Sequence, residues 1–535
     1  LVLASLFRVR TLGGLPLWID EAHSAWAARN FLLGNGFSDP IGATSPYKRA
    51  WVTTSLPIAA SFELFGHTEF AARLPMAIYG VLTTVVAYLL GSRFNRLTGY
   101  MLGAFVAIEP FFLVWSRTAR MYAPLTFLYV LSIYVLVLWY DHRKFALKSP
   151  YPPALAVLAW FGLQTHRSFL AFGAVAGLFF AVVAVSGVAR LRISFQSDQK
   201  VTFERKVDRL RFGELERRAR NACLLCLGST LAAIAMLWLF GAPAILSADL
   251  PVGWPVRGRR YYWELLGQMY LLVRYLALIG MAYAWIRYEK GRLLVLAVFV
   301  PFVVASVTPR KAPRFIVHLM PLIGFLAILP LADGLRLAWQ KITEDAEDIS
   351  VSATVMAATG PILVLIVIAT PLTGLAIANG SANPDYQPER SAWPAASEYV
   401  SEHADENALI VSTRPELSLW YYGETDYFFR QKGVTRVVHD GDTVLHSRTG
   451  TIYLTDRSDL RDLLDRNREV WLFADKRFTN RYTDPEMRQL VESEFEQVGN
   501  TNWQNMRLYR DLDSARESHP SREGRAFRRS VGTED

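Results

Sequence analysis

Two adjacent carboxylates, Asp20 and Glu21, follow a short apolar stretch near the start of the chain, within Trp18–His23. Acids placed directly after a membrane helix cost free energy unless they bind something or face water. The same pair is also typical of an ordinary helix start, where an acid complements the helix dipole. The residues from Ala22 to Leu33 then have helical spacing with apolar side chains on one side. This spacing predicts a helix at the membrane interface.

Basic side chains are the second group that could do chemistry, because guanidinium groups pair with phosphate through two parallel hydrogen bonds. Several occupy the loops on the same side of the membrane as Asp20, which are the loops that normally hold few bases. The alternative is that some of them only extend toward lipid headgroups. These bases are Lys48, Arg49, Arg117, Arg120, Arg167, Arg257, Arg310 and Arg314.

The elements that must position these residues are mostly membrane helices. The chain has 535 residues, of which 52% are hydrophobic and 20% charged, and apolar runs long enough to cross about 30 Å of hydrocarbon recur along it. We predict eleven spans, the first of them only a fragment. They lie at Leu1–Phe7, Leu74–Leu90, Leu102–Trp115, Ala123–Trp139, Pro153–Leu163, Leu170–Val188, Leu224–Phe240, Leu265–Trp285, Leu293–Val307, Phe315–Leu331 and Val351–Ile377.

Loop charge predicts the orientation. Alternate loops carry clusters of Lys and Arg, the longest of them between Arg190 and Arg220, and the positive-inside rule places these loops in the cytoplasm. The N-terminus is then cytoplasmic, and everything after Ile377 is extracytoplasmic. Because the bases sit between apolar runs and not on a soluble face, the net charge of +9 indicates a bilayer protein and requires no nucleic-acid partner.

Composition changes beyond Asn379 to that of a soluble α/β domain. Buried strands are predicted at Ala408–Ser412, Val434–Val438, Thr451–Leu454 and Val470–Ala474, and helices at Leu460–Arg466 and Pro485–Glu494, the latter with Asp484 as its N-cap. We therefore divide the chain into a transmembrane domain (1–379), an α/β domain (380–513) and a disordered tail (514–535).

The order of motifs in the first 170 residues resembles the GT-C glycosyltransferases, in the branch of the protein O-mannosyltransferases and aminoarabinose transferases. The succession is WIDEAHSAWAARNFLLGNG, SPYKRAWVTTSLPIAASFELFG, HTEFAARLPMAIYGVLT and AIEPFFLVWSRTARMYAP. A weaker similarity covers residues 300–335, through Pro313, Arg314, Phe315 and Pro321. The resemblance implies that the membrane domain, for which hydropathy predicts about eleven helices, is GT-C-like and uses a polyprenyl-phosphate-linked sugar donor.

The resemblance also implies roles. Asp20 is expected to deprotonate or orient the acceptor, with Glu21 contacting the acceptor or holding the geometry. Glu109 is expected as a further acid that binds a metal, positions the sugar or pairs with Arg117 or Arg120. Three or four of the outer bases should contact the donor phosphate. Attack opposite the phosphate would invert the anomeric centre.

Several aromatic and histidine residues are weaker candidates. Some relatives use a loop histidine with a glutamate to hold a divalent metal, and His166 stands in such a loop. The alternative is a hydrogen-bonding loop residue. Tyr122, Tyr261 and Tyr262 could contact sugar or lipid, although aromatic belts are expected at membrane surfaces anyway.

The α/β domain contains Leu419–Gly423, which invites comparison with the WWDYG signature of oligosaccharyltransferases. No Asp stands between the aromatic residues and no Asp-x-Asp pair occurs in the second outer loop, so transfer of a whole oligosaccharide to asparagine is not expected. The domain could bind acceptor or glycan, or could simply cap the outer loops.

The sequence thus favours an inverting cell-membrane glycosyltransferase that moves a sugar from a polyprenyl-phosphate donor to an extracytoplasmic acceptor. The acceptor could be a lipid-linked glycan, a protein or another envelope glycan. One alternative is a non-catalytic transporter or flippase-associated protein, for which ionisable residues within the spans and repeated halves would be expected. Another is a glycan-binding scaffold, in which Asp20 would be dispensable.

Overall fold

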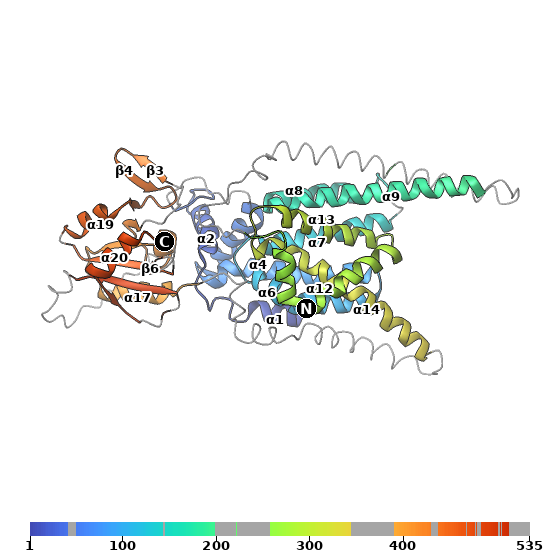
Figure 1. Ribbon diagram of the computed structural model, residues 1–535, viewed down its shortest axis with the longest axis horizontal. Helices are drawn as coiled ribbons and strands as arrows, with labels where there is room; N and C mark the ends of the chain where they lie inside the picture. Colours follow the sequence, from blue (N-terminus) through green and yellow to red (C-terminus); the bar gives the residue numbers. More distant parts are fainter. Residues whose placement is uncertain are drawn as a thin grey trace.

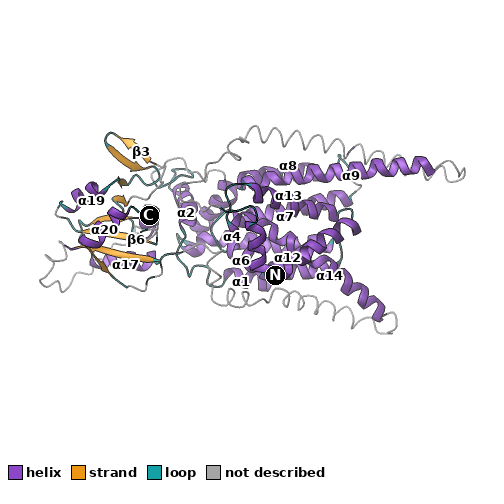
Figure 2. Cartoon of the chain, viewed as in Figure 1, coloured by secondary structure: helices purple, strands orange, loops and turns teal. Residues whose placement is uncertain are grey.

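The computed structural model of the protein describes residues 1–40, 50–142, 145–197, 221, 257–343, 390–429, 437–466, 468–476, 478, 483–500, 503 and 505–512. Strands are confined to one end of the molecule, and a bundle of long helices forms the other end (Figure 2). This arrangement confirms the predicted fold class, which is a helical membrane domain followed by an α/β domain.

The bundle is built from helices of very different lengths (Figure 1). They are α1 (Val2–Val9), α2 (Ile19–Leu32), α3 (Leu56–Phe65), α4 (Glu69–Ser92), α5 (Arg96–Ile108), α6 (Pro110–Ser116), α7 (Tyr122–Asp141), α8 (Tyr151–Thr165), α9 (Leu170–Ser197), α12 (Tyr261–Arg287), α13 (Gly291–Val307) and α14 (Met320–Thr343), with the short helical turns η2 (Trp51–Ser55), η3 (Arg167–Phe169) and η4 (Pro313–Leu319). Side-chain caps define several starts. Thr68 accepts a hydrogen bond from Ala71 N, and Asn95 accepts one from Thr98 N.

Five helices in the described part of the chain are long and apolar enough to cross a membrane, and the protein is a membrane protein. They are Glu69–Ser92, Tyr122–Asp141, Arg167–Ser186, Tyr261–Arg287 and Pro313–Gln340. The spans expected at Leu224–Phe240 and Val351–Ile377 lie outside the described residues, so the total of eleven stays a prediction.

One predicted span is broken. The run Leu102–Trp115 forms two helices, α5 and α6, bent by 58° at Glu109 and Pro110. Proline has no backbone N–H and suits the first position of a new helix. The Glu109 carboxylate caps that helix by accepting hydrogen bonds from Phe111 N (2.9 Å) and Phe112 N (2.7 Å). The break therefore places a carboxylate within the thickness of the bundle.

The α/β domain holds an eight-stranded sheet in the order β3-β4-β5-β2-β1-β6-β8-β7. Its centre is parallel, from β5 (Ile452–Leu454) through β2 (Tyr427–Phe429) and β1 (Leu409–Ser412) to β6 (Val470–Asp475). The other strands pair antiparallel at the two edges and are β3 (Val437–Asp440), β4 (Thr443–His446), β7 (Phe495–Val498) and β8 (Met506–Asp511). The helices are α17 (Trp393–His403), α18 (Pro415–Tyr421), α19 (Arg457–Leu464) and α20 (Pro485–Glu494).

The sequence predictions for this domain agree in three strands and both helices. Asp484 caps α20 as expected, accepting a hydrogen bond from Glu486 N at 3.0 Å. The fourth predicted strand, Val434–Val438, is observed at Val437–Asp440, and residues 434–436 of the prediction lie outside the described part. The disordered tail predicted at 514–535 also lies outside it.

Helix α2 lies at the end of the bundle that faces the α/β domain (Figure 1), and its predicted place at the membrane interface stays a prediction. Most of its side chains are buried. One hydrophobic core joins both sides, with Trp26, Ile58 and Met76 from the membrane domain packed together with Trp393 and Trp471 from the α/β domain. The α/β domain is therefore fixed against the helix that carries Asp20.

Candidate active site

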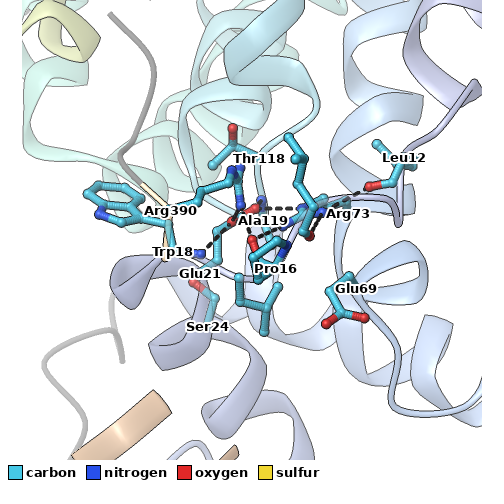
Figure 3. A network of polar contacts seen from close by, with 12 residues as sticks. Leu12, Pro16, Trp18, Glu21, Ser24, Glu69, Arg73, Thr118, Ala119 and Arg390 are labelled. Atoms are coloured by element: carbon cyan, nitrogen blue, oxygen red, sulfur yellow. Dashed lines mark hydrogen bonds and ion pairs between the residues drawn. The ribbon is translucent and has the colours of Figure 1, made fainter. Parts of the chain in front are cut away.

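Glu21 is the centre of a buried ion-pair network (Figure 3). Its carboxylate is fully buried and pairs with Arg73 of α4, at 2.8 Å from Nε and 3.1 Å from Nη2, and with Arg390 Nη1 at 2.5 Å. It also accepts hydrogen bonds from Trp18 N (3.0 Å) and Ala119 N (2.9 Å). A single carboxylate thus connects helix α2, helix α4, the turn after α6 and the start of the α/β domain.

The arginines of this network are themselves well partnered. Arg73 donates to the backbone carbonyls of Leu12 (2.9 Å), Leu15 (2.7 Å) and Pro16 (3.0 Å), and Arg390 also donates to Pro16. Burial alone would raise the pKa of Glu21, but the charges of Arg390 and Arg73 outweigh it and hold that pKa far below its usual range. Glu21 is thus a permanent anion whose oxygens are occupied by protein groups.

Asp20, one residue earlier, has a different environment. Its side chain is 23% exposed, and its Oδ2 lies 3.8 Å from Nη2 of Arg120, whose side chain is 4% exposed. Arg120 is oriented by further hydrogen bonds to the Asp20 carbonyl (3.0 Å) and to Ser24 Oγ (3.2 Å). This carboxylate is reachable from outside and sits beside a fixed positive charge.

Aromatic side chains surround this position. The Arg314 guanidinium lies 5.3 Å above the Trp18 ring and interacts electrostatically with Asp20 and Arg120. Ring contacts continue from Trp18 to Trp115 (6.3 Å), Tyr122 (5.0 Å), His166 (5.9 Å) and Phe315 (6.3 Å). The structure therefore brings together Asp20, Arg120, Tyr122, His166 and Arg314, which the sequence proposed separately. We call this group the Asp20 cluster.

Glu109 belongs to a different group. Besides the two backbone N–H groups of α6, it accepts a hydrogen bond from the Tyr270 hydroxyl and interacts electrostatically with Arg8 of α1. Arg8 in turn donates to the carbonyls of Val106 and Ala107, each at 2.9 Å. These contacts place Glu109 at the break between α5 and α6, so its predicted role near the sugar stays a prediction.

The remaining outer bases are dispersed. Arg117 donates to the carbonyls of Phe7 (3.2 Å) and Arg10 (2.8 Å), and these hydrogen bonds hold the end of α1 in place. Arg257 donates to the Tyr261 hydroxyl (2.7 Å) and to the carbonyl of Lys311 (3.2 Å). Arg167 and Arg310 are exposed, and Lys48 and Arg49 lie outside the described residues.

The two candidate tyrosines at the start of α12 help to hold the loop before η4. Tyr262 is buried, and its hydroxyl contacts both the N–H and the carbonyl of Ala312 at 3.2 Å. The Tyr261 ring meets the Tyr262 ring edge to face, with ring centroids 5.0 Å apart. Both residues therefore support the segment that leads to Arg314, and any contact with sugar or lipid stays a prediction.

A charged cluster that sequence reasoning missed lies where α2 meets the α/β domain. Arg448 Nη1 is 2.5 Å from His23 Nε2, and the Glu416 carboxylate lies 3.7 Å from His23 and 4.0 Å from His446. Asp39 is 3.9 Å from Arg448 Nε. Burial lowers the pKa of both histidines and raises the pKa of Asp39 to about 6. Only His23 carried a sequence signal, because it stands three residues after Asp20.

The sequence suggested a divalent metal, and such an ion needs several of the usual metal-ligand groups close together. No group of three or more His, Cys, Asp or Glu side chains in the described ranges is arranged to hold an ion. His166 Nδ1 accepts a hydrogen bond from Ser168 N at 3.1 Å, and the Glu109 oxygens already accept hydrogen bonds. Metal dependence stays a prediction.

Comparison with known proteins gives a family match over part of the chain. Residues 52–195 match the family described as dolichyl-phosphate-mannose-protein mannosyltransferase. An uncharacterized protein of Aquifex aeolicus is 28% identical over 156 residues. That match spans 28% of this chain and 29% of the relative.

Solved structures match over nearly the whole chain. ArnT from Cupriavidus metallidurans bound to undecaprenyl phosphate has a TM-score of 0.56 at 13% identity, covering 96% of this chain and 97% of that one. The oligosaccharyltransferase AglB from Archaeoglobus fulgidus, in complex with an inhibitory peptide and a dolichol-phosphate, has a TM-score of 0.51 at 12% identity, covering 94% and 73%. Together with the family match, these findings confirm the resemblance to GT-C glycosyltransferases, and the solved structures show that the chain has their fold.

Proposed function

We propose that the protein is a glycosyltransferase that moves a sugar from a polyprenyl-phosphate donor to a hydroxyl-bearing acceptor. The observation that supports this most is the pairing of a partly exposed carboxylate, Asp20, with the buried Arg120, next to the partly buried guanidinium of Arg314. A donor of this class brings a phosphate and an electrophilic carbon to one place. The Asp20 cluster offers a carboxylate for the acceptor hydroxyl that attacks this carbon and guanidinium groups for the phosphate, on a fold shared with a structure that contains undecaprenyl phosphate.

The proposed reaction is a single displacement. The acceptor oxygen bonds to the anomeric carbon while the bond from that carbon to the phosphate oxygen breaks, and the electron pair leaves with the phosphate. The acceptor proton passes to the Asp20 carboxylate, which acts as general base. Arg120 and Arg314 stabilise the negative charge on the departing phosphate. Attack from the opposite side inverts the anomeric centre.

The acceptor side of the site is assigned to the face covered by the α/β domain. Two contacts hold the α/β domain on this face. Arg390 pairs with Glu21, and Trp26 Nε1 of α2 donates to the Glu416 carbonyl at 3.0 Å. Loop charge supports an extracytoplasmic location for this domain. An acceptor could be a lipid-linked glycan, a protein hydroxyl or another envelope glycan.

A transfer assay tests the proposal. The purified protein in lipid nanodiscs is incubated with a panel of radiolabelled polyprenyl-phosphate hexoses and pentoses and with membrane extracts as acceptor. We expect wild type to transfer label from one donor, with inverted anomeric configuration, and Asp20→Asn to lose transfer. Asp462→Asn, which changes an exposed acid on α19, serves as the matched control. Absence of transfer from every donor, or full activity of Asp20→Asn, would contradict the proposal.

A further inference from the structure

His318 is a buried histidine to which neither the sequence nor the proposed reaction assigns a role. Its side chain is 2% exposed, and neither Nδ1 nor Nε2 has a hydrogen-bond partner among the described residues. Leaving a polar group buried and unpaired costs free energy, and native proteins leave few of them. Two such atoms on one ring indicate that a partner is missing.

The position of His318 connects it to the Asp20 cluster. It lies in η4, four residues after Arg314, and it interacts electrostatically with His166. His166 is in ring contact with Phe315 and with Tyr122, and Tyr122 interacts with Arg314. His318 therefore lies within electrostatic range of His166, a member of the Asp20 cluster.

The neighbours of His318 do not replace the missing partner. Its ring meets Tyr129 edge to face at 5.1 Å, an arrangement that can give one N–H only a weak contact with a π face. The Tyr129 hydroxyl is already used, because it donates to the Ala297 carbonyl at 2.7 Å. At least one ring nitrogen is thus left for a group that is not part of the described protein.

We propose that His318 binds a phosphate oxygen of the polyprenyl-phosphate donor, and this inference rests on the proposed function. Helix η4 runs directly into α14, so His318 lies deeper in the bundle than Arg314, by about 8 Å at the rise of a 3-10 helix. The sugar must lie toward Asp20, and the prenyl chain must lie toward the lipid. We place the phosphate between them, in the interval between Arg314 and His318, where the imidazole N–H of His318 donates to it.

The test measures binding of undecaprenyl phosphate to the full-length protein in detergent, by the shift of the unfolding midpoint and by titration. We expect His318→Leu to weaken binding about tenfold or more, as for a lost hydrogen bond to a charged group. His318→Gln, which keeps one donor, should retain part of the affinity. His142→Leu, a substitution of the same kind at an exposed position after α7, should bind as wild type does.

Two further ligands identify what is recognised. Undecaprenol, which lacks the phosphate, should show no dependence on His318, and inorganic phosphate at the same concentration should not shift the midpoint. A His318-dependent shift with inorganic phosphate would assign the site to free phosphate and overturn the lipid assignment. Equal loss of undecaprenol binding in His318→Leu would show that the residue only packs.

The outcomes separate this inference from the proposed function. If wild type does not bind undecaprenyl phosphate, the proposed function itself fails. If wild type binds it and both His318 variants bind it equally well, only the role of His318 is overturned. Should His318→Leu not fold, the comparison of wild type with His318→Gln, together with a shift of the His318 signal in the ¹⁵N-histidine spectrum on adding lipid, decides the question.

Discussion

Asp20 and Glu21 are neighbours in the chain, yet they occupy opposite kinds of environment. Every contact of the buried Glu21 carboxylate is with protein, through Arg73, Arg390 and two backbone N–H groups. Asp20 is partly exposed and lies beside Arg120, 3.8 Å away. Successive residues on a helix point in directions about 100° apart, so one face of α2 is used for assembly and the next face carries the proposed general base.

The Glu21 network holds the Asp20–Arg120 pair in position. Glu21 binds the backbone of Ala119, next to Arg120, and lies next to Asp20 itself. Both members of the Asp20–Arg120 pair are therefore held by the same buried anion. Substitutions in the Glu21 network should change stability first, and substitutions in the Asp20 cluster should change turnover first.

The largest stability effect is expected for Glu21→Gln. This change leaves Arg73 and Arg390 buried without their anion, which costs about 3–5 kcal/mol in comparable cases. We expect a large fall in the free energy of unfolding, measured by denaturant titration in detergent. Asp20→Asn should leave that free energy nearly unchanged. A stable but inactive Glu21→Gln would show that Glu21 takes part in the chemistry.

A smaller effect on binding is expected for Arg314→Gln. Loss of a guanidinium that pairs with the donor phosphate should raise the donor KM by about tenfold or more, while stability changes little. Steady-state kinetics against donor concentration measures it. Arg310→Gln, an exposed arginine four residues earlier, is the matched control. Equal effects of the two substitutions would remove Arg314 from the donor site.

Arg390→Met tests the link to the α/β domain. Glu21 keeps its pair with Arg73 in this variant, so we expect a loss of about 1–3 kcal/mol, smaller than for Glu21→Gln. The loss should appear as earlier proteolysis of the α/β domain. A double variant with Glu21→Gln should lose less than the sum of the two single changes, because the residues are in direct contact. Additive losses would contradict a shared network.

The smallest effect concerns pH, and it involves the cluster of His23, His446, Asp39, Glu416 and Arg448. Burial lowers the pKa of both histidines, so their neutral forms favour the folded state, and this stability is lost as pH falls below 6.5. Asp39 acts in the opposite direction. Its pKa is raised from 3.8 to about 6, so the folded state gains relative stability as pH falls through that interval.

Two histidines lower the stability on acidification and one aspartate raises it. We therefore expect the unfolding midpoint to fall modestly between pH 6.5 and pH 5. Asp39→Asn removes the opposing contribution and should make the fall steeper, whereas His23→Asn should make it shallower. Midpoints measured across this range in each variant test the sign. A midpoint that rises on acidification in wild type would contradict it.

The sequence predicted those features that local patterns determine. Apolar length identified the spans in α4 and α7, and short buried runs identified β1, β5 and β6. The break between α5 and α6 was missed, although Glu109 and Pro110 mark it, because hydropathy continues across them.

Contacts between distant parts of the chain could not be predicted in this way. Arg390 reaches Glu21 across 369 positions, and Arg448 reaches His23 across 425. Arg73 lies in the motif HTEFAARLPMAIYGVLT, but the residues next to it in the sequence do not identify Glu21 as its partner. His318 is a single histidine within an apolar run, and its unpaired nitrogens are visible only once the surrounding side chains are placed.

The central claim is that Asp20 performs the chemistry beside a phosphate that other residues hold. The most direct measurement is a single turnover, with a radiolabelled donor bound to the protein before acceptor is added. We expect Asp20→Asn to bind as much donor as wild type and to transfer the sugar about 10²–10⁴-fold more slowly. Transfer at the wild-type rate by Asp20→Asn would contradict the claim.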